Sequence, residues 1–467
     1  MGLQRTIFSF VVDDDPRFAY EAWHLARSLV EHCGGEPGAI HVQCTPGAYE
    51  RRASLFREQG YAVHELARFG DGRHCNKIAQ LDNLRDAEFD RAVLLDTDML
   101  ALADLRPFLR DDAIQGKIVD MANPPLAALR EIAAASGLTS LPPVCATDAR
   151  DGETYAGNCN GGFYCVPRAL CEPLSAHWRR WALWLLENAE PLRRVQREQH
   201  ADQVSFWLAL QHAALPFEAA PSNLNYYVHF AGAHAYFDEA RAIALLHYHA
   251  ISMNVVGMLD PPAALTERER TAVAAANRQI AGGFDNRVFW DMRYRHFPQR
   301  GSGIGSRGDN LAYKRRLLQA QGIETAASVL DVGCGDLEVV KELDLRRYLG
   351  IDQSPQSLGA ARRARPEWEF RTGLGGDVPA AEMVLCFEVL IHQETAGAYH
   401  GLIAFLAAKT LRALLVSGYA ADSDGIRSNP MLFFHEPLET SLRRTGRFSS
   451  IRQIGAHTDV VVYRCEV

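Results

Sequence analysis

The fold of the second half of the chain is decided by eight residues, Val329-Leu330-Asp331-Val332-Gly333-Cys334-Gly335-Asp336. An apolar strand here enters a turn whose glycines let the backbone approach a ligand without a clash from a Cβ atom. Residues 337–343 are compatible with a helix, and residues 348–352 give a second apolar strand that ends in Asp352. An acid at that place bonds ribose hydroxyls in nucleotide-binding folds. The order of these elements predicts the opening of an α/β domain.

This stretch resembles the first motif of class I S-adenosylmethionine-dependent methyltransferases, and the resemblance extends over about residues 310–467. It implies a Rossmann-like fold and S-adenosylmethionine as the cofactor. The residues expected to bind it are Asp331, Gly333, Gly335 and Asp352. A dinucleotide fingerprint needs a third glycine three residues after Gly335, and the chain has none there. NAD binding is therefore kept only as an alternative.

Two further segments resemble this methyltransferase class. Residues 382–392 are similar to its fourth strand and the segment that follows. His392 is a candidate general base because an imidazole pKa lies near neutral pH, and His435 is its rival. A packed structural histidine is the alternative for each. The glycine-rich residues 301–308 either fold over the cofactor or form a flexible linker.

The first half contains a strand of its own, residues 91–95, which ends in Asp96-Thr97-Asp98. Ligands bind at the carboxyl ends of parallel strands. Two carboxylates separated by one residue can approach a single hard cation, and oxygen ligands suit Mg²⁺ or Mn²⁺. A solvated acidic turn is the alternative for the triplet taken alone.

Residues 6–255 carry short motifs, in order, that resemble the retaining glycosyltransferases of family 8, which have a GT-A fold. The resemblance implies a nucleotide-sugar donor, expected to be a UDP-sugar, and Mn²⁺ or Mg²⁺. The implied metal ligands are Asp96, Asp98 and His247, with His249 as a second candidate. The implied substrate-binding residues are Asp13, Lys77, Asn160, Gly161 and Gly162. Asp202 and Gln203 are the implied catalytic pair beside the reacting sugar.

The chain departs from the family pattern at two places. Val204 stands where a further acid follows the Asp-Gln pair, and residues 250–252 replace the Gly and Lys-Pro-Trp that follow the metal His. Because that tail holds the diphosphate, an alternative is a first domain that binds a glycan or nucleotide without catalysis.

Composition agrees with a globular protein, and the length with two large domains or about three ordinary ones. The chain has 467 residues, of which 48% are hydrophobic and 23% charged, and its net charge is −8. A nucleic-acid coat is therefore not expected, and no stretch offers the roughly 18 apolar residues of a membrane span. The ten scattered cysteines favour free thiols in a reducing cytoplasm. The expected domains are 1–262 and 284–467, joined by a linker helix at 263–283.

These observations together predict a bifunctional cytoplasmic enzyme of glycan biosynthesis. The first domain would transfer a sugar and the second would methylate the glycan, with an oxygen as the expected acceptor atom. The acceptor glycan is either free or lipid-linked, which allows a peripheral position on the inner face of the membrane. A homo-oligomer is compatible with the sequence.

Overall fold

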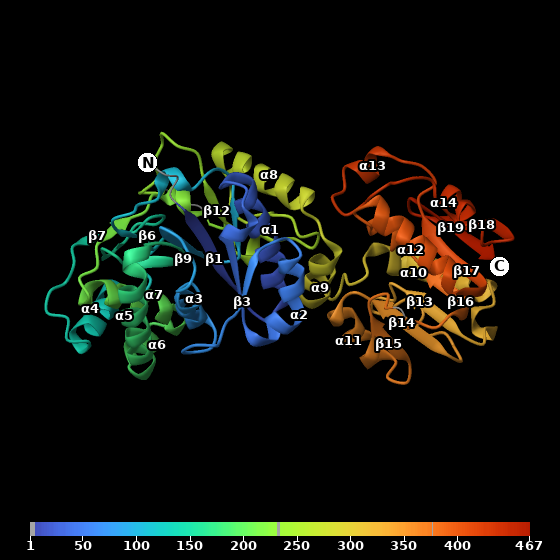
Figure 1. Cartoon of the computed structure of the whole chain (residues 1–467), viewed down its shortest axis with the longest axis horizontal. Coiled ribbons are helices and arrows are strands. Elements are labelled where there is room, and N and C mark those ends of the chain that lie inside the picture. The colour runs from blue at the N-terminus through green and yellow to red at the C-terminus, as the bar shows by residue number, and fades with distance from the viewer. Residues whose placement is uncertain (1–4, 231–233, 376) are drawn as a thin grey trace. The chain divides into compact units, whose positions relative to one another are not determined.

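The computed structural model describes residues 5–230, 234–375 and 377–467, and the chain divides into two compact α/β units (Figure 1). Unit 1 comprises Met1–Asn254 and Met258–Ile280, and unit 2 comprises Val255–Gly257 and Ala281–Val467. The helix expected as a linker over residues 263–283 lies almost wholly in unit 1. It is tied there by a hydrogen bond from Tyr226 Oη to Glu269 Oε1 at 3.3 Å.

Unit 1 is built on a seven-stranded sheet in the order β10-β6-β9-β4-β1-β2-β3. Its strands are β1 (Thr6–Val12), β2 (Ile40–Cys44), β3 (Ala62–Glu65), β4 (Arg91–Leu95), β6 (Ile114–Ile118), β9 (Cys159–Pro167) and β10 (Phe217–Ala219). β9 runs antiparallel to both of its neighbours, β4 and β6, and the remaining pairs are parallel. The carboxyl ends of β1 and β4 therefore open onto the same edge.

A three-stranded sheet in the order β11-β12-β5 places His247 beside the acidic triplet. Its strands are β5 (Met99–Ala101), β11 (Tyr226–Tyr227) and β12 (Leu245–His247). In its register His247 lies opposite Met99 on one side and next to Tyr227 on the other. A two-stranded sheet, β7 (Val144–Ala146) with β8 (Glu153–Tyr155), completes the strands of this unit.

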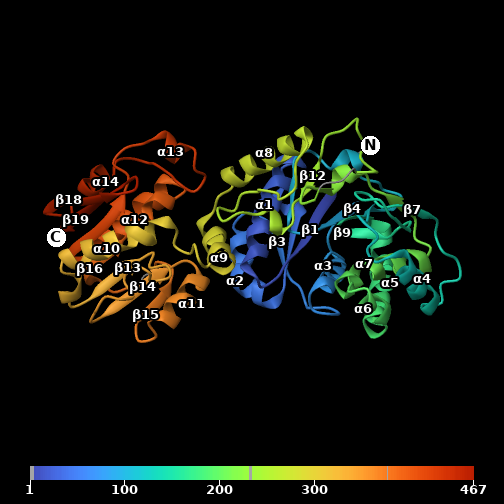
Figure 2. The same ribbon diagram turned by 180° about the vertical axis from the view of Figure 1, so that it is seen from behind.

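The helices of unit 1 cover its sheets. They are α1 (Pro16–His32), α2 (Pro46–Arg57), α3 (Gln80–Asn83), α4 (Leu126–Ala135), α5 (Arg168–Glu187), α6 (Glu190–Arg194), α7 (Ala201–His212) and α8 (Glu267–Gly282). α1 begins at Pro16 because the Asp15 side chain accepts a hydrogen bond from Arg17 N and the proline occupies the first turn. α4, α5, α6 and α7 lie together in both views (Figure 2). Trp178 of α5 packs edge-on against Phe206 of α7, which fixes this pair of helices.

Unit 2 contains a seven-stranded sheet in the order β15-β14-β13-β16-β17-β19-β18. Its strands are β13 (Val329–Val332), β14 (Tyr348–Asp352), β15 (Glu369–Thr372), β16 (Ala381–Cys386), β17 (Thr410–Gly418), β18 (Ser450–His457) and β19 (Val460–Glu466). The first five strands are parallel in the doubly wound order, and β19 is antiparallel to both of its neighbours. This confirms the Rossmann-like α/β expectation for the second half, whereas the GT-A expectation for the first half stays a prediction.

The helices of unit 2 are α9 (Asn286–His296), α10 (Gly308–Ala320), α11 (Pro355–Ala364), α12 (Ala396–Lys409), α13 (Asp424–Arg427) and α14 (Leu438–Arg444). The helix expected at residues 337–343 is wrong, because these residues form a series of turns. Leu337 has a left-handed backbone with φ of 63°, which a right-handed helix cannot accommodate. The apolar spacing arises instead because Leu337, Val340 and Leu343 are all buried in the core.

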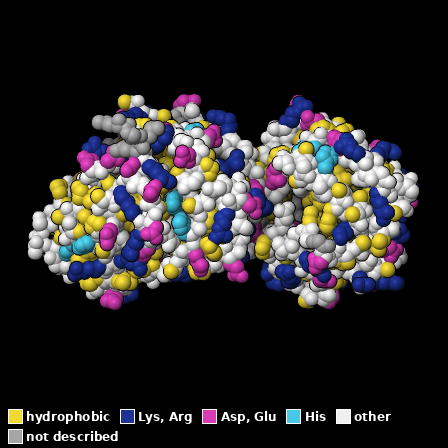
Figure 3. Space-filling model, viewed as in Figure 1, with side chains coloured by type: hydrophobic (Ala, Val, Ile, Leu, Met, Phe, Trp, Pro, Cys, Tyr) yellow, Lys and Arg dark blue, Asp and Glu magenta, His cyan; other side chains and the backbone are white. Residues whose placement is uncertain are grey.

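The surface charge, the cysteines and the helices of the structure agree with what the composition predicts. On the face shown in Figure 3, basic and acidic side chains are interspersed. All ten cysteines are free, as expected. Among the described residues, no helix has the length and apolar character needed to cross a membrane.

Candidate functional site

Unit 1 has a cavity of about 1240 Å³ at the carboxyl ends of β1 and β4. The predicted site residues that line it are Asp13, Lys77, Asp96, Asp98, Asn160, Gly161, Asp202, Gln203 and His247. They come from segments far apart in the sequence. Thr97, between the two acids, turns toward α1 and donates a hydrogen bond to Glu21 Oε2 at 2.9 Å, which anchors the acidic turn.

His247 and Asp98 lie side by side in the lining of this cavity. His247 Nε2 lies 3.2 Å from Asp98 Oδ1, yet it is buried and has no hydrogen-bond partner. Its Nδ1 lies 2.8 Å from Asn225 Oδ1, which can only accept, so the ring proton is on Nδ1. Nε2 is therefore the ring atom that faces the carboxylate oxygen, and either a proton or a metal ion between the two atoms would make this contact favourable.

His249 completes a group of three ligand atoms that lie within 4.8 Å of one another, with Asp98 and His247 as the other members. Its Nδ1 is 3.5 Å from Asp98 Oδ2. The backbone of His249 has φ of 52°, a strained value for a non-glycine residue that turns its ring toward the site. Burial raises the pKa of Asp98, but the two imidazoles outweigh it and hold that pKa below its usual range.

Asp96, expected as a metal ligand, is not part of this three-residue group. Its Oδ1 accepts a hydrogen bond from Lys77 Nζ at 2.7 Å. The same ammonium lies 3.5 Å from Asp202 Oδ2 and donates to Gly161 O at 2.8 Å. Burial lowers the pKa of Lys77, but Asp96 and Asp202 together raise it above its ordinary value. Lys77 thus holds the two acids in place rather than standing free for a phosphate.

Asp202 is nearly fully buried at the start of α7, with Gln203 beside it in the cavity wall. Burial raises its pKa, although the charge of Lys77 lowers it in part. Its Oδ1 is buried and has no hydrogen-bond partner. A carboxylate oxygen of this kind is available to a ligand hydroxyl or to a developing positive charge.

The two glycines of segment 160–162 leave room for the side chains of Lys77 and His247. A Cβ on Gly161 would lie 2.8 Å from Lys77 Nζ, and one on Gly162 would lie 2.8 Å from His247 Cε1. Asn160 Oδ1 accepts from Gly162 N at 2.8 Å and from Asn225 Nδ2 at 2.9 Å. This segment therefore fixes both the lysine and the histidine positions.

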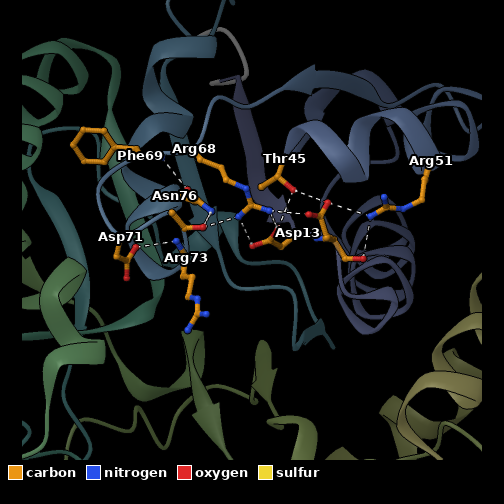
Figure 4. Close-up of polar contacts among 10 residues, drawn as sticks. Asp13, Thr45, Arg51, Arg68, Phe69, Asp71, Arg73 and Asn76 are labelled. Carbon is orange, nitrogen blue, oxygen red and sulfur yellow. Dashed lines mark hydrogen bonds and ion pairs between the residues drawn. The ribbon is translucent and has the colours of Figure 1, made fainter. Parts of the chain in front are cut away.

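Asp13, expected to contact the nucleotide, is held by its neighbours. It accepts hydrogen bonds from Arg68 at 2.7 Å and from Thr45 Oγ1 at 3.0 Å (Figure 4). Arg68 also pairs with Asp14 at 2.9 Å, and Arg51 reaches Asp14 at 3.1 Å. The acidic turn after β1 is thus neutralised by arginines at the cavity rim.

Unit 2 has a cavity of about 400 Å³ at the ends of β13, β14 and β16. The glycine turn forms one wall, with φ of 80° at Gly333 and 56° at Gly335. A Cβ on Gly333 would lie 2.1 Å from Val389 Cγ2, and one on Gly335 would lie 2.5 Å from Ser302 Oγ. Both positions therefore require glycine for backbone and for space.

Asp352 and Asp331 both line this cavity. Asp352 accepts from Gly335 N at 3.0 Å and from Ser354 N at 2.8 Å, which ties the glycine turn to the next strand end. Burial raises its pKa, and these backbone hydrogen bonds lower it in part. Burial also raises the pKa of Asp331 to about 7, although its hydrogen bond from Tyr348 opposes the shift.

The lining of this cavity is acidic. Its charged members are Asp331, Glu338, Asp352 and Glu388, and the described lining residues include no Lys or Arg. The turns at residues 337–343 also mean that no helix begins directly after the glycine turn, although a helix N-terminus at that place is what binds a pyrophosphate. The cavity therefore suits a cationic ligand better than an anionic dinucleotide.

His392 reaches this cavity and its rival does not. His392 lies in the lining, and its Nδ1 donates to Met431 O at 2.7 Å, which leaves Nε2 as an acceptor. Burial lowers its pKa to about 4, so the ring is neutral near pH 7. His435 is outside the lining and is bonded to Gln393 O at 2.8 Å.

Several site residues could not be read from the sequence. Glu388 lies in the lining, bonded to His457 Nε2 at 2.5 Å and ion-paired with the buried Lys314 at 2.8 Å. Burial raises the pKa of Glu388, but these two partners outweigh it and lower the pKa to about 2. Asn225 lies 22 residues before His247 in a stretch without any motif. A positive φ at Glu388 is the kind of strain that marks such sites, but it is visible only in coordinates.

No protein-family model matches the chain, and no curated protein matches it either. Among solved structures, magnesium protoporphyrin IX methyltransferase from Synechocystis PCC 6803 matches with 19% identity and a TM-score of 0.31, covering 39% of this chain and 97% of that one. N-methyltransferase NodS from Bradyrhizobium japonicum WM9 matches with 17% identity and a TM-score of 0.28, covering 34% and 85%. A putative O-methyltransferase from Nostoc punctiforme PCC 73102 matches with 15% identity and a TM-score of 0.30, covering 38% and 60%. TM-scores of this size identify no family, and the resemblance of residues 6–255 to family 8 glycosyltransferases stays a prediction.

Proposed function

We propose that the chain is a bifunctional enzyme of glycan biosynthesis. Unit 2 transfers a methyl group from S-adenosylmethionine to a hydroxyl oxygen of the glycan. Unit 1, with a GT-A fold, transfers a sugar from a UDP-sugar with Mn²⁺ or Mg²⁺. The protein acts in the cytoplasm, on a free or lipid-linked acceptor and without nucleic acid, as a monomer or a homo-oligomer.

The observation that carries the methyltransferase proposal is the acidic lining of the unit 2 cavity. It is strengthened by the absence of a helix directly after the glycine turn at residues 337–343. S-adenosylmethionine carries a sulfonium and an ammonium, which such a lining attracts. A dinucleotide carries a pyrophosphate, which it repels. The cavity of about 400 Å³ also lies within the usual range for small-molecule sites. These features support S-adenosylmethionine over NAD.

When bound, S-adenosylmethionine supplies a methyl group already activated by the positive sulfur. The task of the chain is then to align an acceptor hydroxyl and to receive its proton. His392 Nε2 is the acceptor for that proton, because Met431 O holds the other ring proton on Nδ1. Asp352 and Asp331 hold the cofactor by its hydroxyl and cationic groups. Most of the rate enhancement comes from alignment in a cavity that excludes water.

Titration calorimetry of the whole protein tests this half of the proposal. S-adenosylmethionine and S-adenosylhomocysteine should bind, whereas NADH should not. The variant Asp352→Asn keeps the side-chain size and removes the charge, so it should weaken both ligands about tenfold or more. Absence of binding to the wild-type protein, or tighter binding of NADH, contradicts methyl transfer in unit 2.

The lone pairs of His247 and Asp98 carry the proposal for unit 1. Two imidazoles and a carboxylate are a donor set that Mn²⁺ accepts, and the acidic cavity needs a cation before it can take a diphosphate. A bound metal ion would neutralise charge on the leaving diphosphate. Asp202, with its free Oδ1, would face the reacting sugar, and Lys77 would keep Asp96 and Asp202 in position.

Hydrolysis of sugar nucleotides, measured with and without Mn²⁺, tests this half. A metal-dependent release of UDP that Asp98→Asn abolishes supports transfer. The alternative is a methyltransferase whose unit 1 only binds a glycan or nucleotide. The ion pairs of Lys77 with Asp96 and Asp202 favour that alternative, because the lysine ammonium is already bound to two carboxylates and is not available to a phosphate. Binding of UDP-sugars without turnover in the presence of Mn²⁺ would select it.

A further inference from the structure

Glu388 is an ionised carboxylate in the wall of the unit 2 cavity, and the proposed methyl transfer gives it no role. Its side chain is 14% exposed and lies in the lining. His457 Nε2 donates to its Oε1 at 2.5 Å, and the ammonium of Lys314 lies 2.8 Å from its Oε2. Burial raises the pKa of Glu388, but these two partners outweigh it and lower the pKa to about 2. Glu388 is therefore negative near neutral pH and is not a base.

Two features of the fold hold this carboxylate in place. The side chain of Lys314 is buried, and among the described residues it pairs with no acid other than Glu388. The backbone of Glu388 has φ of 59°, and its N–H donates to Ser417 Oγ of β17 at 2.7 Å. A buried cation and a strained backbone both cost stability, and strain of this kind is concentrated at functional sites. Together they indicate a carboxylate prepared for a ligand.

Glu388 lies on the side of the cavity where the methyl acceptor has to enter. Strands β14, β13, β16 and β17 are adjacent and parallel, so their carboxyl ends share one edge. Asp352 ends β14 on one side of the glycine turn, whereas Glu388 and His392 follow β16 on the other. Burial lowers the pKa of His392, and the charge of Glu388 is among the effects that oppose this shift. The carboxylate thus acts on the group that is the proposed base.

The glycine-rich segment 301–308 folds over this cavity rather than serving as a free linker. Ser302 and Ser306 lie in the lining, and Gly305 packs on the Glu388 carboxylate so closely that a Cβ atom there would clash. A covered carboxylate is less screened by water, so its effect on a neighbouring charge is larger than it would be at the surface.

A fixed carboxylate beside the acceptor discriminates between sugars by their charge. Each oxygen of Glu388 keeps a lone pair after its contact to His457 or Lys314, so it can accept a hydrogen bond from a sugar hydroxyl. It repels the carboxylate of a uronic acid and the phosphate of a phosphorylated sugar. The described residues of the lining include no Lys or Arg that would offset this repulsion.

We propose that Glu388 binds the methyl acceptor through a hydroxyl next to the one that is methylated, so that unit 2 methylates neutral sugars and rejects acidic ones. The inference rests on the proposed methyl transfer and names the class of substrate that this site takes.

Nitrophenyl glycosides used as acceptor probes test the inference, with release of S-adenosylhomocysteine by the whole protein as the readout. The panel pairs each neutral glycoside with its uronic-acid counterpart and adds the hexosamines. The wild type should use a neutral glycoside at least about 100-fold better than its acidic counterpart. Glu388→Gln should lower kcat/KM for the neutral probe about tenfold, mainly through KM, and should narrow the preference to less than about tenfold. Binding of S-adenosylhomocysteine, measured by calorimetry, should not change.

Glu382→Gln is the matched control. Glu382 lies at the opposite end of β16, pairs with Arg412 at 2.6 Å and is outside the lining, so its variant should behave as the wild type. Because Glu388→Gln leaves the buried Lys314 unpaired, a double variant with Lys314→Met keeps the test valid if the single variant unfolds.

Three results would each overturn the inference. They are equal use of neutral and acidic glycosides by the wild type, methylation of hexosamines alone, and weaker binding of S-adenosylhomocysteine by Glu388→Gln. The last result would place Glu388 on the cofactor instead of the acceptor. A wild-type protein that methylates no glycoside of the panel would instead contradict the proposed methyl transfer itself.

Discussion

The Nε2 atom of His247 lies 3.2 Å from Oδ1 of Asp98. Asn225 causes this arrangement, because its amide oxygen keeps the imidazole proton on Nδ1. The assignment of the Asn225 amide is itself fixed, since its Nδ2 donates to Asn160 Oδ1 at 2.9 Å. A chain of side-chain amides therefore orients one histidine lone pair at one carboxylate, which is how proteins prepare a metal ligand.

We expect Asp98→Asn to remove the response of unit 1 to Mn²⁺. A metal ion present at about 100 times its dissociation constant stabilises a fold by about 2.7 kcal/mol, and the variant should lose this gain. Thermal unfolding with and without millimolar Mn²⁺ measures it. Asp96→Asn is the matched control: because Lys77 occupies Asp96, that variant should keep most of the gain. Equal losses in both variants would restore Asp96 to the ligand set.

The side-chain amide of Asn225 should affect the affinity of unit 1 for Mn²⁺ although it is not itself a proposed metal ligand. Asn225→Leu has a similar volume but frees the proton of His247 to move to Nε2, where it would block the metal. Loss of such a supporting group lowers metal affinity by about 10- to 100-fold. Competition for Mn²⁺ against a chelating dye gives the affinity directly. An unchanged affinity would mean that the tautomer of His247 is set by something other than Asn225.

The elements of the fold could be read from apolar runs and turn residues. The predicted strand at residues 91–95 is β4, and the acid expected after the second Rossmann strand is Asp352 at the end of β14. These features are local, because a buried parallel strand is apolar along its length. The prediction of a helix at residues 337–343 is wrong because Leu337, Val340 and Leu343 are buried at helix-like spacing although the segment forms turns.

The partners of the site residues could not be read from the sequence. The pairing of Lys77 with Asp96 depends on how the segment before β4 packs over its end, and no spacing rule encodes that. The contact of Arg68 with Asp13 could not be predicted either, since the two residues lie 55 positions apart in the sequence. Motifs identify groups capable of chemistry, whereas tertiary packing decides which of those groups neutralise one another.

The glycine turn of unit 2 allows backbone strain and steric clash to be separated. Gly333→Ala places a Cβ 2.1 Å from Val389 at a φ of 80°. Gly446→Ala meets a similar φ of 62° with no atom within 4 Å. The left-handed backbone costs about 1–2 kcal/mol in each variant, and overpacking adds about 1–3 kcal/mol in the first. Urea unfolding should show this difference, and binding of S-adenosylhomocysteine should be lost only in Gly333→Ala.

His392 and His435 offer a matched pair for the proposed base. His392→Gln should lower methyl transfer to a glycan acceptor about 10²- to 10⁴-fold, the usual contribution of a general base. Binding of S-adenosylmethionine should change little. His435 is outside the cavity lining and is bonded to the backbone oxygen of Gln393, so the rate of His435→Gln should stay near that of the wild type. A larger loss in His435→Gln than in His392→Gln would exchange their roles.

The protonation of His392 should also appear in the pH dependence of stability. Burial lowers its pKa from 6.5 to about 4 in the folded chain, whereas the unfolded chain titrates near 6.5. Between these values the unfolded state binds the extra proton, so stability falls as the pH falls through this window. The difference of about 2.5 pKa units corresponds to at most about 3 kcal/mol. Other buried histidines contribute as well, so the test is the difference between the wild type and His392→Gln, in urea unfolding at pH 7 and pH 4.5. We expect the variant to lose less stability than the wild type on acidification, and an equal loss would mean that folding does not lower the pKa of His392.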